Sequence, residues 1–209
     1  MTQKIEGNSY FGVSVYTVDM PDFLDSAIEV ADEFLKENKQ EINEIYPVKM
    51  TGNMFMDRRM DPLCHFAANS ARAILDDQGY DINLFNMYFS EMWTQQHYKG
   101  SGMDHHVHGQ GTQITGFYFL EVPKDSSRVI FHDSNVGKLL TGLPEKDVSK
   151  VTASSTMINF EPKAGQFMFT NAWLPHSFTK NNSEQPFKFI HFNLGVELLP
   201  QQLPDIEVV

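Results

Sequence analysis

The chain has 209 residues, 41% of them hydrophobic and 21% charged, a composition that excludes intrinsic disorder and supports one buried core. Its formal net charge of −11, without a cluster of Lys and Arg, argues against nucleic-acid binding, because a phosphate backbone is held by basic side chains. No apolar run approaches the roughly 20 residues of a membrane helix, and the first ten residues lack the features of a secretory signal. We therefore expect a single domain over residues 1–209, without a membrane partner, in the cytoplasm of its cell or, if the protein is viral, of the host.

Two helices are predicted in the first half of the chain. Residues 21–39 place apolar side chains at helical spacing among acidic ones, and Pro21 suits a helix start. Residues 61–77 have Pro62 in the first turn, an apolar stripe, and Gly79 just beyond the end. Both helices are expected to cover a core, mainly within residues 20–80. The Gly-, Asn- and Met-rich segment between them is interpreted as a loop that could contact a substrate.

From residue 84 onward the pattern changes to short β-rich runs separated by turn residues. The predicted strands are residues 84–98, 113–122, 128–132, 151–160, 166–170 and 187–196. Their connections carry the Pro, Gly, Asn, Asp and Ser that close turns. Helices followed by many antiparallel strands indicate an α+β protein, in which the helices brace one face of a barrel or jelly roll.

Histidines within and beside these strands are the main candidates for chemistry. Residues two apart in a strand point to the same side, so His106 and His108 can share one cavity while Val107 faces away. A third ligand usually comes from a distant strand, and His176 follows a strand and turn that end in Trp-Leu-Pro-His. An H-x-H pair also occurs by chance at protein surfaces, so the pair alone does not decide between a metal site and ordinary hydrogen-bonded histidines.

Four sequence blocks together resemble the 2-oxoglutarate and iron(II)-dependent oxygenase superfamily, and in particular a group of small oxygenases of bacteria and their viruses. The blocks are W-T-Q-Q-H-Y-K-G at 93–100, H-V-H-G-Q-G-T-Q-I-T-G-F-Y-F-L at 106–120, P-K-A-G-Q-F-M-F-T-N-A-W-L-P-H at 162–176 and K-F-I-H-F-N at 188–193. The resemblance implies a double-stranded β-helix, a cupin-like jelly roll with its core at about 84–199. It also implies a use of Fe(II), 2-oxoglutarate and dioxygen.

The same resemblance implies the metal ligands. The usual motif of the superfamily is H-x-D or H-x-E with a distant His, and this chain carries His108 at the carboxylate place. We therefore expect His106, His108 and His176 to hold the iron. Asp104 and Asp133 stay open as alternative carboxylate ligands to His108, because the first alternates onto the same strand face and the second follows a strand end.

A basic side chain is also expected, because the distal carboxylate of 2-oxoglutarate would be buried and costly to leave unpaired. Lys188 occupies approximately the place where the superfamily has Arg or Lys, with Arg128 as the alternative and the Tyr118 hydroxyl as a second donor. An inward Lys188 requires an outward His191, since residues three apart in a strand point to opposite faces. Trp93 and Asn193 are expected to be structural walls of the pocket, and the remaining histidines to have surface or hydrogen-bonding roles.

These expectations describe a dioxygenase that hydroxylates an unknown small-molecule or peptidyl substrate while converting 2-oxoglutarate to succinate. Two alternatives stay open. One is a cupin-like metal enzyme that uses no 2-oxoglutarate, and the other is a non-catalytic jelly-roll module whose histidines are incidental. The sequence leaves the oligomeric state and the substrate open, because one fold serves many chemistries.

Overall fold

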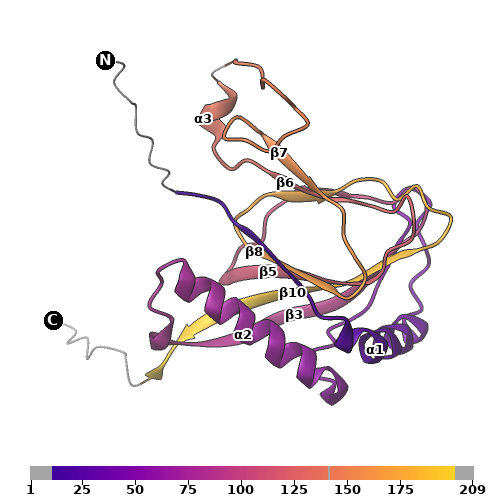
Figure 1. The fold of residues 1–209 in the computed structure, drawn as a ribbon. Helices are drawn as coiled ribbons and strands as arrows, with labels where there is room; N and C mark the ends of the chain where they lie inside the picture. Colours follow the sequence, from indigo (N-terminus) through magenta and orange to yellow (C-terminus); the bar gives the residue numbers. More distant parts are fainter. Residues whose placement is uncertain (1–10, 141, 201–209) are drawn as a thin grey trace, which may run out of the picture.

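The computed structural model describes residues 11–140 and 142–200, which form two antiparallel β-sheets that face each other, with helices against the outer side of the larger sheet (Figure 1). The larger sheet has the order β1 (Val15–Asp19), β8 (Gln166–Asn171), β5 (Thr112–Glu121), β10 (Phe187–Leu198), β3 (Phe85–His97) and β2 (Val48–Met50). The smaller sheet has the order β4 (Met103–His106), β9 (His176–Phe178), β6 (Val129–His132) and β7 (Met157–Phe160). This arrangement confirms the double-stranded β-helix class.

The two predicted helices lie where the sequence places them. Helix α1 spans Leu24–Glu37 after a 3-10 turn at Pro21–Phe23, and α2 spans Asp61–Asp77 with its proline in the first turn. Each helix buries one apolar stripe against the larger sheet. The buried residues are Ala27, Val30, Ala31 and Leu35 in α1, and Leu63, Cys64, Ala67, Ala71, Ile74 and Leu75 in α2. Within the described ranges, no helix combines the length and apolarity that crossing a membrane requires.

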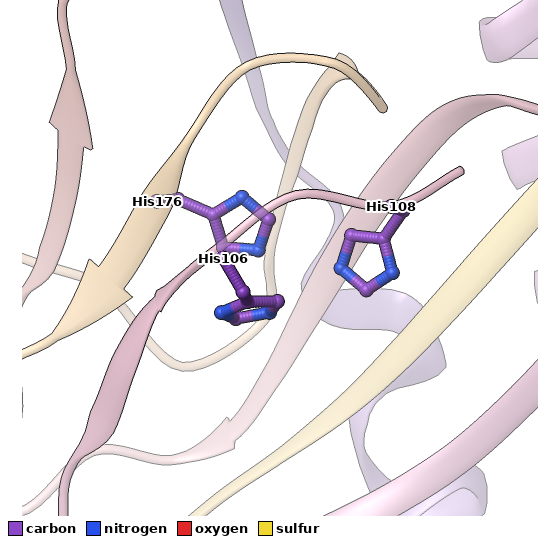
Figure 2. Close-up of side chains that lie close together, drawn as sticks. All are labelled: His106, His108 and His176. Carbon is purple, nitrogen blue, oxygen red and sulfur yellow. The ribbon is translucent and has the colours of Figure 1, made fainter.

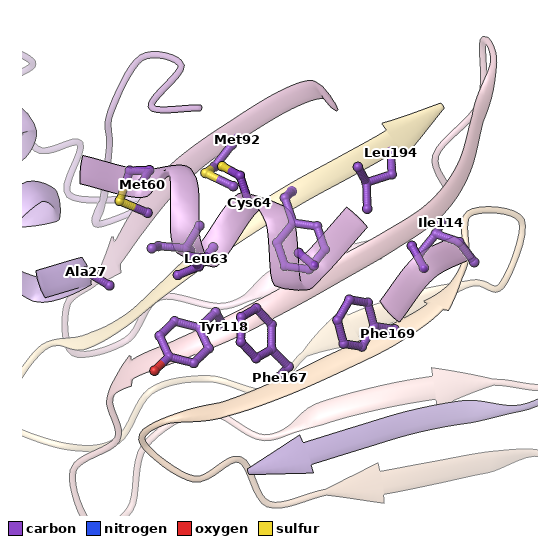
Figure 3. Close-up of a cluster of buried hydrophobic side chains, with 14 of the residues drawn as sticks. Ala27, Met60, Leu63, Cys64, Met92, Ile114, Tyr118, Phe167, Phe169 and Leu194 are labelled. Atoms are coloured by element: carbon purple, nitrogen blue, oxygen red, sulfur yellow. The ribbon is translucent and has the colours of Figure 1, made fainter. Parts of the chain in front are cut away.

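The long strand β10 is buried on both faces, and its two faces belong to different clusters. Ile190, Phe192 and Leu194 pack into the cluster between the larger sheet and the helices, part of which Figure 3 shows. Phe187 and Phe189 pack into a second cluster between the two sheets, together with residues of β6 and β9. Because neighbours in a strand alternate between faces, each residue of β10 is assigned to the helix side or to the interior between the sheets.

Gly116 in β5 is required by the close packing of the central strands on the helix side. A Cβ atom added there would lie 2.3 Å from Cζ of the Phe192 ring and 2.9 Å from the carbonyl oxygen of Met168. Real atoms do not approach so closely, so only glycine lets the ring of Phe192 pack against β5 at this position. The pairing of β5 with β10 then places Thr115 opposite Asn193.

Several elements differ from the sequence prediction. The short strands β1, β2, β4 and β9 were not predicted, and the expected strand at 151–160 is reduced to the four residues of β7. A short helix, α3 (Val136–Leu139), lies in the connection between β6 and β7, on the side of the smaller sheet (Figure 1). The ends of the expected domain, residues 1–10 and 201–209, lie outside the described residues.

Candidate metal centre

Three histidines meet at one end of the smaller sheet. His106 ends β4, His176 begins β9, and the two are direct partners in the β4–β9 pairing. His108 follows two residues after His106, and its backbone N–H donates to the carbonyl of Ala172. One ring nitrogen from each histidine lies within 4.8 Å of the others, and Figure 2 shows the three rings gathered together. We call His106, His108 and His176 the triad.

The hydrogen bonds of the triad leave Nε2 atoms available for a ligand. Nδ1 of His106 lies 2.7 Å from the carbonyl oxygen of Asp104, and Nδ1 of His176 lies 3.0 Å from that of Leu174. Both Nδ1 atoms must donate, because a carbonyl oxygen only accepts. Nε2 of His176 and Nε2 of His108 are buried and have no hydrogen-bond partner. Buried polar atoms without a partner are rare, and in a histidine cluster they are the atoms that a metal would satisfy.

Burial keeps His108 and His176 neutral. Desolvation, together with the charges of neighbouring histidines, lowers the pKa of His176 to about 3 and that of His108 to about 4. A neutral imidazole is the form that binds a metal. Three imidazole ligands on one side of an octahedral ion would leave the opposite positions open for a chelating acid and dioxygen.

A wall of β3 and β10 side chains faces the triad. The His191 ring lies 4.8 Å from that of His108 and 4.3 Å from that of Trp93, and its Nε2 lies 3.1 Å from the Thr115 hydroxyl. Nδ1 of His191 and Nε1 of Trp93 are buried without a partner. The amide nitrogen of Asn193 donates to Glu91 at 2.9 Å and lies 3.3 Å from Nδ1 of His108. The wall is therefore polar at the level of the triad.

The two carboxylates considered as alternative metal ligands are not part of the cluster. Asp104 is exposed and takes part through its backbone carbonyl rather than through its side chain. Asp133 forms an ion pair of 2.6 Å with Lys138. The structure therefore groups His108, and neither aspartate, with His106 and His176.

The expectation that Lys188 and Tyr118 anchor a carboxylate in the interior is corrected by their positions. Lys188 lies on the same face of β10 as Ile190, the helix side. Its Nζ pairs with Asp32 of α1 at 2.6 Å and with Glu121 at 3.2 Å. Tyr118 packs on the helix side (Figure 3), where its hydroxyl donates to the carbonyl of Met20. Both side chains lie on the face of the larger sheet that points away from the triad.

His191, which was expected to face outward, lies on the opposite face of β10 from Lys188 and therefore faces the interior. In the sequence, His191 alternates with Phe187 and Phe189, which the structure places in the interior. Arg128, the alternative anchor, is exposed and pairs with Glu161 at 2.8 Å. His97, expected in a surface or hydrogen-bonding role, is buried in the interior, where its Nε2 atom lies 2.9 Å from Oε1 of Gln95.

Comparison with known proteins identifies the domain. Residues 91–193, from β3 to β10, match the model of a family described as "Putative 2OG-Fe(II) oxygenase", in which 2OG is 2-oxoglutarate, and this segment contains the whole triad. The chain carries a 2OG-Fe(II) oxygenase domain. Enzymes of the 2OG-Fe(II) oxygenase family use Fe(II), 2-oxoglutarate and dioxygen, and one similar structure, the epimerase SnoN, holds Fe3+ and alpha-ketoglutarate. No curated protein matches the sequence.

Solved structures similar to this 2OG-Fe(II) oxygenase domain confirm the fold. A Pseudomonas putida prolyl-4-hydroxylase is 12% identical with a TM-score of 0.60, over 88% of this chain and 93% of that one. The viral collagen prolyl hydroxylase of Paramecium Bursaria Chlorella virus-1 is 14% identical with a TM-score of 0.55, over 86% and 94%. The carbocyclase SnoK of nogalamycin biosynthesis is 11% identical with a TM-score of 0.65, over 90% and 83%. At these identities the likeness concerns the fold alone.

Proposed function

We propose that this protein is an Fe(II)- and 2-oxoglutarate-dependent dioxygenase whose iron is held by Nε2 of His106, His108 and His176. Two observations together carry the assignment of the ligands. One ring nitrogen from each histidine lies within 4.8 Å of the others, and the Nε2 atoms of His108 and His176 are buried and unpaired. In this reaction, bound iron supports the split of dioxygen between 2-oxoglutarate, which becomes succinate and CO2, and a C–H bond of the substrate, which becomes C–OH.

The chain's own residues have three roles in this proposal. The triad holds the metal on one side, and the carbonyl oxygens of Asp104 and Leu174 fix the ring orientation of two ligands. The half-buried Trp93 and the buried His191 line the opposite wall and exclude water from the ligand positions. His108 needs a proton on Nδ1 when Nε2 binds a metal. Rotation of the Asn193 amide, which would give up its bond to Glu91, would place Oδ1 where it accepts a hydrogen bond from that N–H.

The substrate class is part of the proposal. The similar structures include hydroxylases of prolyl residues and enzymes of nogalamycin biosynthesis, so their substrates are peptidyl groups or small molecules. The net charge of −11 supports the same two classes over nucleic acid. A single cysteine, Cys64, buried in α2, supports a reducing compartment, and we place the protein in the cytoplasm.

Anaerobic titration tests the proposal. Iron(II) followed by 2-oxoglutarate should produce the weak visible charge-transfer band of the chelate, and oxygen should then yield succinate slowly without a substrate. His106→Ala and His176→Ala should each lose metal binding and the band while keeping the thermal unfolding midpoint of the metal-free protein. His65→Ala is the matched control, because His65 is exposed on α2 and should change neither.

The second candidate is a cupin-like metal enzyme that does not use 2-oxoglutarate. It is favoured by a ligand set of three histidines without a carboxylate and by the absence of Lys188 from the interior. Iron binding through the triad, combined with no charge-transfer band and no calorimetric signal for 2-oxoglutarate, would make this candidate the better description.

A further inference from the structure

Below the triad, the interior between the two sheets is apolar, and none of the described lysines or arginines is buried in it. Among the residues that the structure describes, Lys188 is the one buried Lys or Arg, and its Nζ lies on the helix side. The interior is filled largely by aromatic rings. The buried members of this cluster are Phe117, Phe119, Val129, Phe131, Met168, Leu174, Phe178, Phe187 and Phe189. A dicarboxylate entering this interior would therefore find no lysine or arginine for its distal carboxylate.

One polar pair lies within this aromatic interior. His97, 0% exposed, has its Nε2 atom 2.9 Å from Oε1 of Gln95, and its Nδ1 atom is buried without any partner. The rings packed against His97 are Phe178, Phe187 and Phe189, at centroid distances of 6.2, 6.2 and 5.3 Å. A ring nitrogen with no partner among phenylalanines is costly unless something else pairs with it.

The pair lies at a suitable depth below the triad. Along the β3–β10 pairing, Trp93 is opposite His191 at the level of the triad, Gln95 is opposite Phe189, and His97 is opposite Phe187. At about 3.3 Å per residue, Gln95 is roughly 7 Å and His97 roughly 13 Å deeper than Trp93 along the strand. The extended five-carbon chain of 2-oxoglutarate spans roughly 5 Å between its carboxyl carbons. A metal–oxygen bond of about 2 Å at one end and a hydrogen bond of about 3 Å at the other extend its reach to roughly 10 Å, a depth between those of Gln95 and His97.

We propose that His97, held by Gln95, receives the distal carboxylate of 2-oxoglutarate in place of a lysine or arginine. This inference rests on the proposed function. The contact of Nε2 with Oε1 of Gln95 makes Nε2 the donor, so Nδ1 can donate to a carboxylate only when the ring carries a second proton. Binding of the dicarboxylate is therefore coupled to uptake of one proton, which forms a charge-assisted hydrogen bond inside the interior.

The surroundings of His97 are consistent with this coupling. Desolvation lowers the pKa of His97 to about 4, so the ring is neutral before the carboxylate arrives. The groups that face it are Gln95 on its own strand, Phe178 of β9, and Phe187 and Phe189 of β10, none of which titrates. A carboxylate at Nδ1 would be the first charge near this ring and would favour its protonated form.

The decisive experiment measures 2-oxoglutarate binding by calorimetry to the anaerobic iron-loaded protein, in two buffers of different ionisation enthalpy. The wild type should take up about one proton per 2-oxoglutarate bound. His97→Phe, which places one more ring among phenylalanines, should weaken binding by about 30-fold or more and abolish the proton uptake, with iron affinity unchanged. Gln95→Leu, which removes the partner of Nε2, should weaken binding by a smaller factor and serves if His97→Phe does not fold.

Two controls separate this role from a structural one. Lys188→Met should bind 2-oxoglutarate as the wild type does, because Lys188 lies on the opposite face. The monocarboxylate 2-oxobutanoate should bind the wild type and His97→Phe equally, since it lacks the distal carboxylate. Wild-type affinity in His97→Phe, or its loss in Lys188→Met, would overturn the assignment. If the iron-loaded wild type binds no 2-oxoglutarate at all, the proposed function fails and this inference fails with it.

Discussion

Asn193 connects the central strand β10 to the triad, since its amide lies against Nδ1 of His108 and is held by Glu91. Groups that contact the outer nitrogen of a metal-binding histidine set its orientation, and their loss typically costs 10–100-fold in metal affinity. Asn193→Leu, similar in size, should therefore weaken Fe(II) or Co(II) binding by about 10-fold or more in a competition assay. Asn182→Ala, in an exposed loop, is the control, and an unchanged affinity in Asn193→Leu would mean that His108 does not depend on this amide.

The sequence could predict the triad but not the wall that faces it. His106 and His108 are two residues apart, the spacing that places side chains on one face of a strand, and His176 is a distant third histidine after another strand. The residue types and their spacing therefore both indicate a metal site. The orientation of Lys188 and His191 could not be settled in the same way. Both faces of β10 are buried, so hydrophobicity does not alternate along it. The sequence therefore does not show which of its residues face the interior.

At the scale of elements, Lys188 attaches β10 to helix α1 rather than lining the site. Its side chain is 5% exposed and its Nζ is 2.6 Å from Asp32, whereas the Asp32 side chain is 53% exposed. Asp32→Ala leaves the buried ammonium with Glu121 alone, so it should lower the free energy of unfolding by about 1–2 kcal/mol, less than for a fully buried pair. Lys188→Met removes the charge and keeps the packing, so it should cost less than about 1 kcal/mol.

Urea unfolding of the two variants, compared with the wild type, checks this order. The opposite result, with Lys188→Met more destabilised than Asp32→Ala, would show that the pair itself stabilises the docking of α1 and that the unpaired ammonium is not costly.

Long elements were predictable and short ones were not, for a physical reason. Helix α2 has a proline in its first turn and a complete apolar stripe, and its predicted bounds agree with the structure. Strands β4 and β9 have four and three residues, too few to show a periodicity, and they exist because each pairs with the other across 70 residues of chain. His106 and His176 of the triad lie on these two strands, so the geometry of the site depends on a contact that no local pattern encodes.

At the scale of the whole molecule, the interior between the sheets combines two environments. Near the triad it is polar, with imidazole, indole and amide groups facing one another, and deeper it is aromatic, with His97 and Gln95 as a polar exception. The larger sheet separates this interior from the helix-side core, which carries the Lys188 ion pairs. Substitutions on the helix side should therefore affect stability, and substitutions in the interior should affect binding.

This concentration of buried histidines predicts an acid-sensitive fold. Burial lowers the pKa of His97 and His108 to about 4 and of His176 to about 3, and it holds the pKa of His191 well below its ordinary value. In the unfolded chain each titrates near 6.5, so below that pH the unfolded state binds more protons than the folded state. Above about pH 6.5 neither state is protonated and the stability does not change. Between about pH 6.5 and 4 the metal-free protein should lose stability steadily.

Denaturant unfolding of the metal-free protein at pH 7.5 and pH 5.0 measures this loss. The carboxyl groups with lowered pKa values, Asp57, Asp133 and Asp147, titrate below about 4 and contribute little in this window. His97→Phe removes one of the four buried histidines without touching the triad, so it should reduce the stability difference between the two pH values by about 2 kcal/mol. Equal stability of the wild type at pH 7.5 and 5.0 would mean that these imidazoles bind protons in the fold as readily as in the unfolded chain, and it would contradict their lowered pKa values.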